Sequence, residues 1–181
     1  MKQDQNHEFF IRIENKAKDN LALCGNCAQT TFLTLTDEFR LEADEILKAL
    51  TPFPGIALRG ETCGAVTGSL MVIGLEFGRD RENLNNWQAY IDSLRPSRKF
   101  CRLFELDMGS TMCEEIVADK FGRRFNLADP KEAMQWFSCG AHEKCGEVIG
   151  KSVCIAANII QESRSKSQNL DPNPIPWFQA G

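Results

Sequence analysis

The chain has 181 residues, of which 43% are hydrophobic and 25% charged, and its formal net charge is -4. This length allows one domain with a substantial core, and the composition is that of an ordinary globular protein. Because acidic and basic residues are interspersed and the net charge is negative, a nucleic-acid-binding face is not expected. No run approaches the roughly 18 apolar residues of a membrane span, and the first residues do not predict a secretory signal. We therefore expect a cytoplasmic protein.

Apolar residues recur at helical spacing along most of the chain, starting near its beginning. Amphipathic helices are predicted over residues 8–22 and 27–41, although four threonines lower the helical propensity of the second. A short helix over 43–50 is stopped by residues 51–55, which contain two prolines and a glycine. The first third of the chain therefore predicts three helices.

Two long helices are predicted in the middle of the chain. The segment over residues 63–75 is almost free of charge, which predicts a buried central helix with Thr62 as its N-cap. Residues 83–104 repeat apolar side chains at the helical period, and Pro96 is expected to bend or break this helix.

The last helices have recognisable start signals. Ser110 or Thr111 can cap a helix that runs to about residue 121. An aspartate and a proline at 129–130 predict another helix start, and this helix continues to about residue 159 with a break near Gly140. No alternating strand pattern occurs, so the sequence predicts an all-α fold, a single-domain bundle of six to seven helices.

The domain is expected to cover residues 1–162, and residues 163–181 form a Pro-rich C-terminal tail. Three prolines within five positions exclude a helix over 172–176. Trp177 and Phe178 could dock the tail on this or a partner subunit, and a disordered end is an equal alternative.

The chemistry of the chain is expected at its cysteines, since histidine occurs only at positions 7 and 142. His142 could be a metal ligand or a proton donor, and a solvated helical residue is the commoner alternative. In a reducing compartment clustered cysteines are metal ligands or redox centres more often than disulfides. The eight cysteines are Cys24, Cys27, Cys63, Cys101, Cys113, Cys139, Cys145 and Cys154.

The positions of the cysteines along the sequence indicate the roles of only some of them. Cys24 and Cys27 form a C-x-x-C pair that can reach one metal ion or each other. Cys63 and Cys113 lie near predicted helix starts, where backbone amides and the helix dipole favour a thiolate. Cys145 and Cys154 are about half a turn out of phase on one helix, so they face different surroundings.

For four other positions, a role in core packing is the alternative to a role in the site. Cys154 and Cys101 are flanked by apolar or aromatic residues and are interpreted as core thiols. Gly64 and Gly68 are four residues apart and clear one helical stripe, either for close helix packing or for a cofactor beside Cys63. Cys24 and Cys139 stay undecided.

The sequence resembles the C_GCAxxG_C_C family of redox-active proteins, on motifs that cover roughly residues 20–162. The matching features are the segments 26–29, 60–68 and 144–151 around three cysteines, and Gly109-Ser110 shortly before the fourth. The resemblance implies four key cysteines, which fall on Cys27, Cys63, Cys113 and Cys145. It also implies a redox role, with iron–sulfur binding as the expected chemistry.

Three functions follow from these observations. The first is a four-cysteine iron–sulfur site, most simply [2Fe–2S], for electron transfer or redox sensing with a redox partner protein. The second is a thiol–disulfide oxidoreductase that uses Cys24 and Cys27. The third is a structural zinc site with four cysteine ligands. A homodimer is an additional expectation, since the small-residue stripe and the aromatic tail could both serve an interface.

Overall fold

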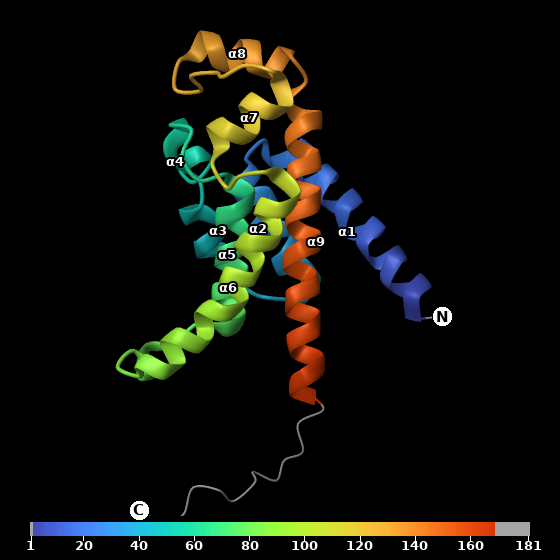
Figure 1. Ribbon diagram of the computed structural model, residues 1–181, viewed down its shortest axis with the longest axis vertical. Coiled ribbons are helices and arrows are strands. Elements are labelled where there is room, and N and C mark those ends of the chain that lie inside the picture. The colour runs from blue at the N-terminus through green and yellow to red at the C-terminus, as the bar shows by residue number, and fades with distance from the viewer. Residues whose placement is uncertain (1, 169–181) are drawn as a thin grey trace, which may run out of the picture.

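The computed structural model describes residues 2–168, and most of these residues are helical (Figure 1). Within them no β-strand forms, and one isolated bridge joins Thr62 to Met112. The all-α prediction is therefore confirmed. The helices are α1 (Lys2–Cys24), α2 (Cys27–Phe39), α3 (Asp44–Ala49), α4 (Gly55–Leu58), α5 (Gly64–Phe77), the 3-10 turn η1 (Arg81–Asn83), α6 (Trp87–Met108), α7 (Cys113–Phe121), α8 (Pro130–Ser138) and α9 (Ala141–Gln168).

The described chain has nine α-helices, where the sequence predicts six or seven. One extra element is α4, a single turn in which φ is positive at Gly55 (52°), Ile56 (47°), Ala57 (58°) and Leu58 (61°). Such a left-handed turn is costly for residues with a Cβ, and sequence periodicity does not predict it. The other is the separation of α8 from α9 at Gly140, where φ is 85° and where the sequence suggests a break.

The predicted helix starts have mixed outcomes. Asp129 caps α8 as expected, since its carboxylate accepts hydrogen bonds from the amides of Lys131 and Glu132. Thr62 is not the N-cap of α5: it pairs with Met112, and Cys63 takes the cap position without a side-chain bond. Ser110 accepts from the amide of Met112, so it closes a turn before α7 rather than capping it. Tertiary pairing overrode the local preference in these two cases.

Two helices extend differently from the prediction. Helix α6 begins at Trp87, after η1, and continues through Pro96 without a break. Helix α9 passes Ser163 and runs to Gln168, so the predicted tail starts with helix. The aromatic pair Trp177 and Phe178 lies outside the described residues.

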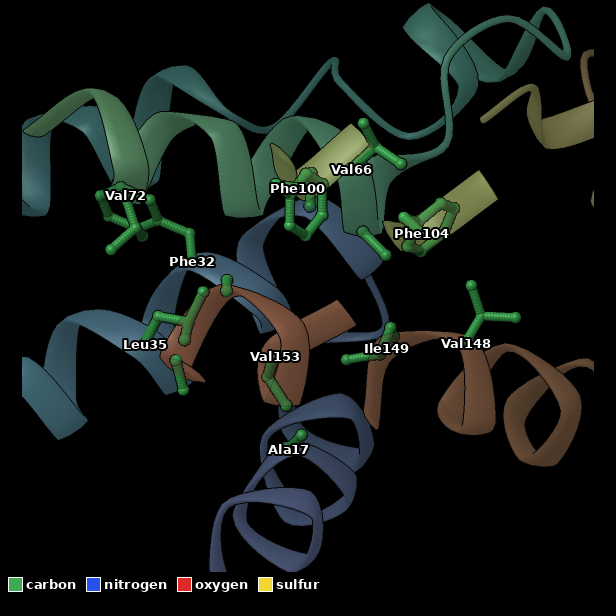
Figure 2. Packing of buried hydrophobic residues seen from close by; sticks show 14 of the residues in the cluster. Ala17, Phe32, Leu35, Val66, Val72, Phe100, Phe104, Val148, Ile149 and Val153 are labelled. Atoms are coloured by element: carbon green, nitrogen blue, oxygen red, sulfur yellow. The ribbon is translucent and has the colours of Figure 1, made fainter. Parts of the chain in front are cut away.

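The core lies where the long helices cross. Helix α5 packs most extensively on α2, and α9 contacts α1, α2, α5 and α6. Figure 2 shows Phe32, Phe100 and Ile149, from α2, α6 and α9, in this core, and all three are at least 99% buried. The low charge of α5 is explained by its position between α2, α6 and α9.

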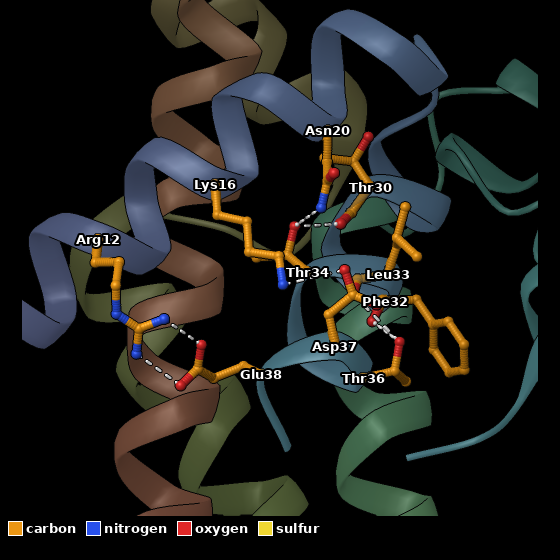
Figure 3. A network of polar contacts seen from close by, with 10 residues as sticks. All are labelled: Arg12, Lys16, Asn20, Thr30, Phe32, Leu33, Thr34, Thr36, Asp37 and Glu38. Atoms are coloured by element: carbon orange, nitrogen blue, oxygen red, sulfur yellow. Dashed lines mark hydrogen bonds and ion pairs between the residues drawn. The ribbon is translucent and has the colours of Figure 1, made fainter. Parts of the chain in front are cut away.

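Polar contacts join α1 to α2 at the edge of this core (Figure 3). The two terminal guanidinium nitrogens of Arg12 donate to the carboxylate of Glu38, at 2.7 and 2.8 Å. Lys16 pairs with Asp37 at 3.0 Å, and Asn20 donates to the Thr34 hydroxyl at 3.0 Å. Because the two ion pairs are solvent-exposed, we expect each to stabilise the fold by about 1 kcal/mol at most.

Among the described helices, none is both long enough and apolar enough to cross a membrane.

Candidate functional site

Four cysteines lie at or near the N-termini of four helices. Cys27 is the first residue of α2, Cys63 is the N-cap of α5, and Cys113 is the first residue of α7. Cys145 lies in the second turn of α9. The sequence predicts helix-start positions for Cys63 and Cys113, and the structure confirms both.

The position of Cys27 is fixed by the turn between α1 and α2. Gly25 has φ of 60°, a left-handed conformation that suits glycine, and it reverses the chain after Cys24. The Asn26 side chain then accepts from the amide of Gln29 at 3.0 Å and donates to the carbonyl of Thr51 at 3.1 Å. Cys24 and Cys27 therefore lie on two different helices, although helical spacing would have put them on one face.

A short backbone clamp fixes Cys63 beside Cys113. The amide of Cys63 donates to the carbonyl of Thr111 at 2.8 Å, and the amide of Cys113 donates to the carbonyl of Glu61 at 2.7 Å. These bonds flank the bridge between Thr62 and Met112. The two cysteines, 50 positions apart, are thus held in register by main-chain hydrogen bonds.

Two glycines allow close approach to the sulfurs. A Cβ added at Gly64 would collide with Cys27 Sγ and lie 2.8 Å from the amide nitrogen of Ala28. A Cβ at Gly55 would lie 3.4 Å from Cys113 Sγ. The left-handed turn α4 therefore packs directly on Cys113, and α5 begins directly against Cys27.

All four cysteines line one cavity of about 360 Å³. Its other walls come from the turn at 55–58, from α7, from α8 and from the start of α9. The lining includes Trp136, Phe137 and Leu127, and none of the described residues that line the cavity carries a formal charge at neutral pH. Cysteines from four distant segments thus share one apolar space.

The environment of the cavity keeps the thiols protonated. Burial raises the pKa of Cys145 to about 12, with the charge on Cys63 as a further cause. Burial also raises the pKa of Cys113 and of Cys27 well above the ordinary value, and for both the other cavity cysteines raise it further. The pKa of Cys63 is raised by burial as well. The four groups repel one another once ionised, so all are neutral at pH 7 in the absence of a cation.

Backbone amides oppose this effect in part. The amides of Ala65 and Val66 hydrogen-bond to Cys63 and lower its pKa, and the amide of Gly64 does the same for Cys27. The N-terminal ends of α2, α5 and α7 also direct their positive dipole ends towards these residues. The site thus has built-in stabilisation for thiolates, which becomes effective when a cation offsets their mutual repulsion.

The remaining cysteines lie elsewhere. Cys24 ends α1 and does not line the cavity, and Cys139 is exposed at the end of α8. Cys101 is half-buried against the core, in agreement with its interpretation as a core thiol. Cys154 is likewise half-buried, faces a groove beside α1, and lies 3.9 Å from the carbonyl of Phe10. The predicted phase difference between Cys145 and Cys154 is confirmed.

Two other predicted residues have distinct positions. His142 is exposed and lines the edge of the cavity, one turn before Cys145 on α9. Gly68 lies against α2, where a Cβ would come within 2.5 Å of the Ala28 carbonyl oxygen, and this is a helix-packing contact. A role of Gly68 in cofactor binding stays a prediction.

Within residues 2–168, no three His, Cys, Asp or Glu side chains lie close enough together to hold a metal ion as they stand.

Several cavity residues were not singled out from the sequence. The amides at the start of α5 leave no sequence signal, because every residue has one. Asn26 could have been recognised as an N-cap directly before a helix, and the cluster at 51–55 marks a turn without indicating its contact with a cysteine. Trp136 and Phe137 appear in the sequence as ordinary apolar positions of a helix.

The fold and the site define an all-helical protein with a largely apolar cavity shared by four cysteines. A family model described as "Putative redox-active protein (C_GCAxxG_C_C)" matches residues 25–159. The chain therefore belongs to the C_GCAxxG_C_C family of redox-active proteins, as the sequence motifs predict. Searches of curated proteins and of solved structures found no match.

Proposed function

We propose that the chain binds an iron–sulfur cluster, most simply [2Fe–2S], for electron transfer or redox sensing. The proposed ligands are Cys27, Cys63, Cys113 and Cys145. One observation carries the proposal: these four cysteines, from four separate helices, line a single cavity. Four thiolates satisfy the ligand count of such a cluster, which would supply reversible one-electron chemistry at the site.

The chain's own residues prepare the site for this group. The clamp between 61–63 and 111–113 fixes two thiols relative to each other, and Asn26 fixes the helix start that holds a third. Amides of α5 donate to two sulfurs, and such hydrogen bonds stabilise bound thiolates and tune the reduction potential. The largely apolar lining limits contact with water, which also tunes the reduction potential of a bound cluster.

Four protons must leave when four thiolates form. Burial and mutual repulsion keep the thiols neutral, so metal binding is coupled to proton release and becomes stronger as the pH rises.

The thiol–disulfide alternative is less well supported. Cys24 does not line the cavity, and Gly25 turns the chain between it and Cys27. The raised pKa of Cys27 also removes the thiolate that attacks a disulfide. Structural zinc needs four sulfurs within about 2.3 Å of one point, whereas two irons can divide the four thiolates between them. The four sulfurs can therefore lie farther apart around a two-iron cluster than around a single zinc ion.

Anaerobic purification followed by iron and acid-labile sulfide assays tests the proposal. We expect brown protein with about two irons and two sulfides per chain. Colourless protein without iron after attempted cluster reconstitution would contradict it, and stoichiometric zinc would favour the structural alternative. The Cys101→Ser variant is a suitable control, because Cys101 packs against the core away from the cavity.

We further propose that the protein acts in the cytoplasm with a redox partner protein, and that it forms a homodimer.

A further inference from the structure

The cavity extends well beyond its four cysteines, along walls formed by the turn at 55–58, α7 and α8. The cavity has about 360 Å³. This volume falls in the range of small-molecule sites, about 300 to 1,000 Å³.

The walls without cysteines are apolar and partly aromatic. They are formed by Leu58 of the left-handed turn, by Leu127 before α8, and by Trp136 and Phe137 of α8. In Figure 1, α8 lies across the end of the molecule above α7 and α4, so it closes this part of the structure. A flat apolar molecule would gain the most contact with such walls.

Trp136 offers one specific polar contact. Its Nε1–H is buried and has no hydrogen-bond partner among the described residues. A buried donor without an acceptor is unfavourable, and because Trp136 lines the cavity, a carbonyl oxygen bound there would satisfy it once the indole turns its N–H towards the ligand. The wall therefore favours a ligand that carries a carbonyl.

The absence of charged residues in the described cavity lining disfavours redox-active molecules that carry phosphate groups. Flavin and nicotinamide nucleotides carry phosphates, which proteins bind with lysine, arginine or free helix-start amides. No described lining residue is charged, and the first amides of α5 already donate to Cys27 and Cys63. A quinone is flat, uncharged and rich in carbonyls, and it is redox-active like the family of this chain.

We propose that the cavity also binds a quinone, between α8 and the left-handed turn α4. Electron transfer between the quinone and the cluster rests on the proposed function. Binding of the quinone depends only on the apolar residues that line the cavity. A fully substituted quinone such as duroquinone is the appropriate probe, since it has no ring position open to addition by a cysteine thiol.

Isothermal titration calorimetry of the full chain with duroquinone tests the proposal. We expect saturable binding to the wild-type chain, and binding at least about tenfold weaker for Phe137→Glu, because a carboxylate at the wall opposes an apolar ligand. Met134→Glu is the matched control, since it lies on the same helix at 76% exposure and does not line the cavity. Phe137 is 60% exposed, so its replacement is compatible with folding, which circular dichroism verifies.

A second variant tests the carbonyl contact. Trp136→Phe keeps an aromatic wall and removes the donor, and we expect binding about threefold to tenfold weaker. Absence of binding to the wild-type chain, or equal loss for Phe137→Glu and Met134→Glu, would overturn the proposal. So would tight binding of nicotinamide mononucleotide in place of the quinone.

The titration is run on iron-loaded and on iron-free protein, with iron measured separately. Quinone binding to a chain that takes up no iron would refute the cluster and support the quinone site. A brown, iron-containing protein that binds no quinone would support the cluster and refute the quinone site.

Discussion

Two regions of the molecule are built in different ways. In the middle of the molecule the long helices α5, α6 and α9 cross and bury large apolar side chains from several directions (Figures 1 and 2). At one end short elements, α4, α7 and α8, surround a cavity whose walls include four thiols. The first region is stabilised by close packing. The second contains a left-handed turn and protonated buried thiols, which suggests that a bound group completes it.

The largest expected effect is the loss of iron on substitution of a cavity cysteine, which distinguishes the site from the core. Replacement of Cys63 by serine should abolish bound iron, since substitutions beside metal ligands alone already cost about 10- to 100-fold in affinity. The free energy of unfolding of the iron-free protein should change little in comparison. Iron assays and chemical denaturation measure the two quantities. Retention of full iron by Cys63→Ser would contradict the ligand assignment.

A core substitution should have the opposite signature. Phe104 is fully buried and stacks on Phe100 with ring centroids 5.8 Å apart. We expect Phe104→Ala to lower the free energy of unfolding by about 3–5 kcal/mol, because it leaves a cavity. The folded fraction should still bind iron. A loss below about 1 kcal/mol would show that the region around Phe104 is not the stabilising core.

Gly64 lies where the two regions meet, and a methyl group there should disturb both the site and the packing of α5 on α2. The added Cβ would collide with Cys27 Sγ, so we expect iron affinity to fall by about tenfold or more in Gly64→Ala. Gly74→Ala is the matched control on the same helix, since a Cβ there meets nothing within 4 Å. Equal iron binding by both variants would remove the proposed role of Gly64.

The iron-free protein should lose stability in alkali because of the cavity thiols. The folded-state pKa of Cys145 is about 12, against an ordinary value of 9.0. Above pH 9 the unfolded chain releases thiol protons that the folded chain retains, so each shifted thiol favours unfolding by about 1.4 kcal/mol more per pH unit. Below pH 9 the thiols are protonated in both the folded and the unfolded chain, so their contribution to the free energy of unfolding is fully retained.

Denaturation at about pH 8 and about pH 10.5 measures this dependence. Cys145→Ser should show a smaller decrease than the wild-type chain, since it lacks one of the shifted groups. Identical decreases in the two proteins would mean that Cys145 ionises normally in the folded state.

The smallest expected effect lies at the surface, away from both regions. Arg12 pairs with Glu38 between α1 and α2, and its side chain is 57% exposed. Arg12→Ala should therefore lower the free energy of unfolding by about 0.2–1 kcal/mol and leave iron binding unchanged. A larger loss would indicate that α1 depends on this contact for its attachment, which a thermal melt would reveal.

The sequence by itself determined the elements whose signals are local. Helical periodicity identified the long helices, and an aspartate followed by proline identified the start of α8. Helix phase separated Cys145 from Cys154, and motifs identified the family. These properties depend on residues within a few turns of one another, so they can be predicted without a structure.

Only the tertiary structure decided how distant segments meet. It paired Thr62 with Met112 where a local signal predicted a cap, and it formed a left-handed turn against Cys113. It also brought Cys27, Cys63, Cys113 and Cys145 to one cavity and placed Trp136 in its wall. Local preferences are worth about 1 kcal/mol or less per residue, whereas packing of whole helices involves far more buried surface. The packing therefore decides which residues share a site.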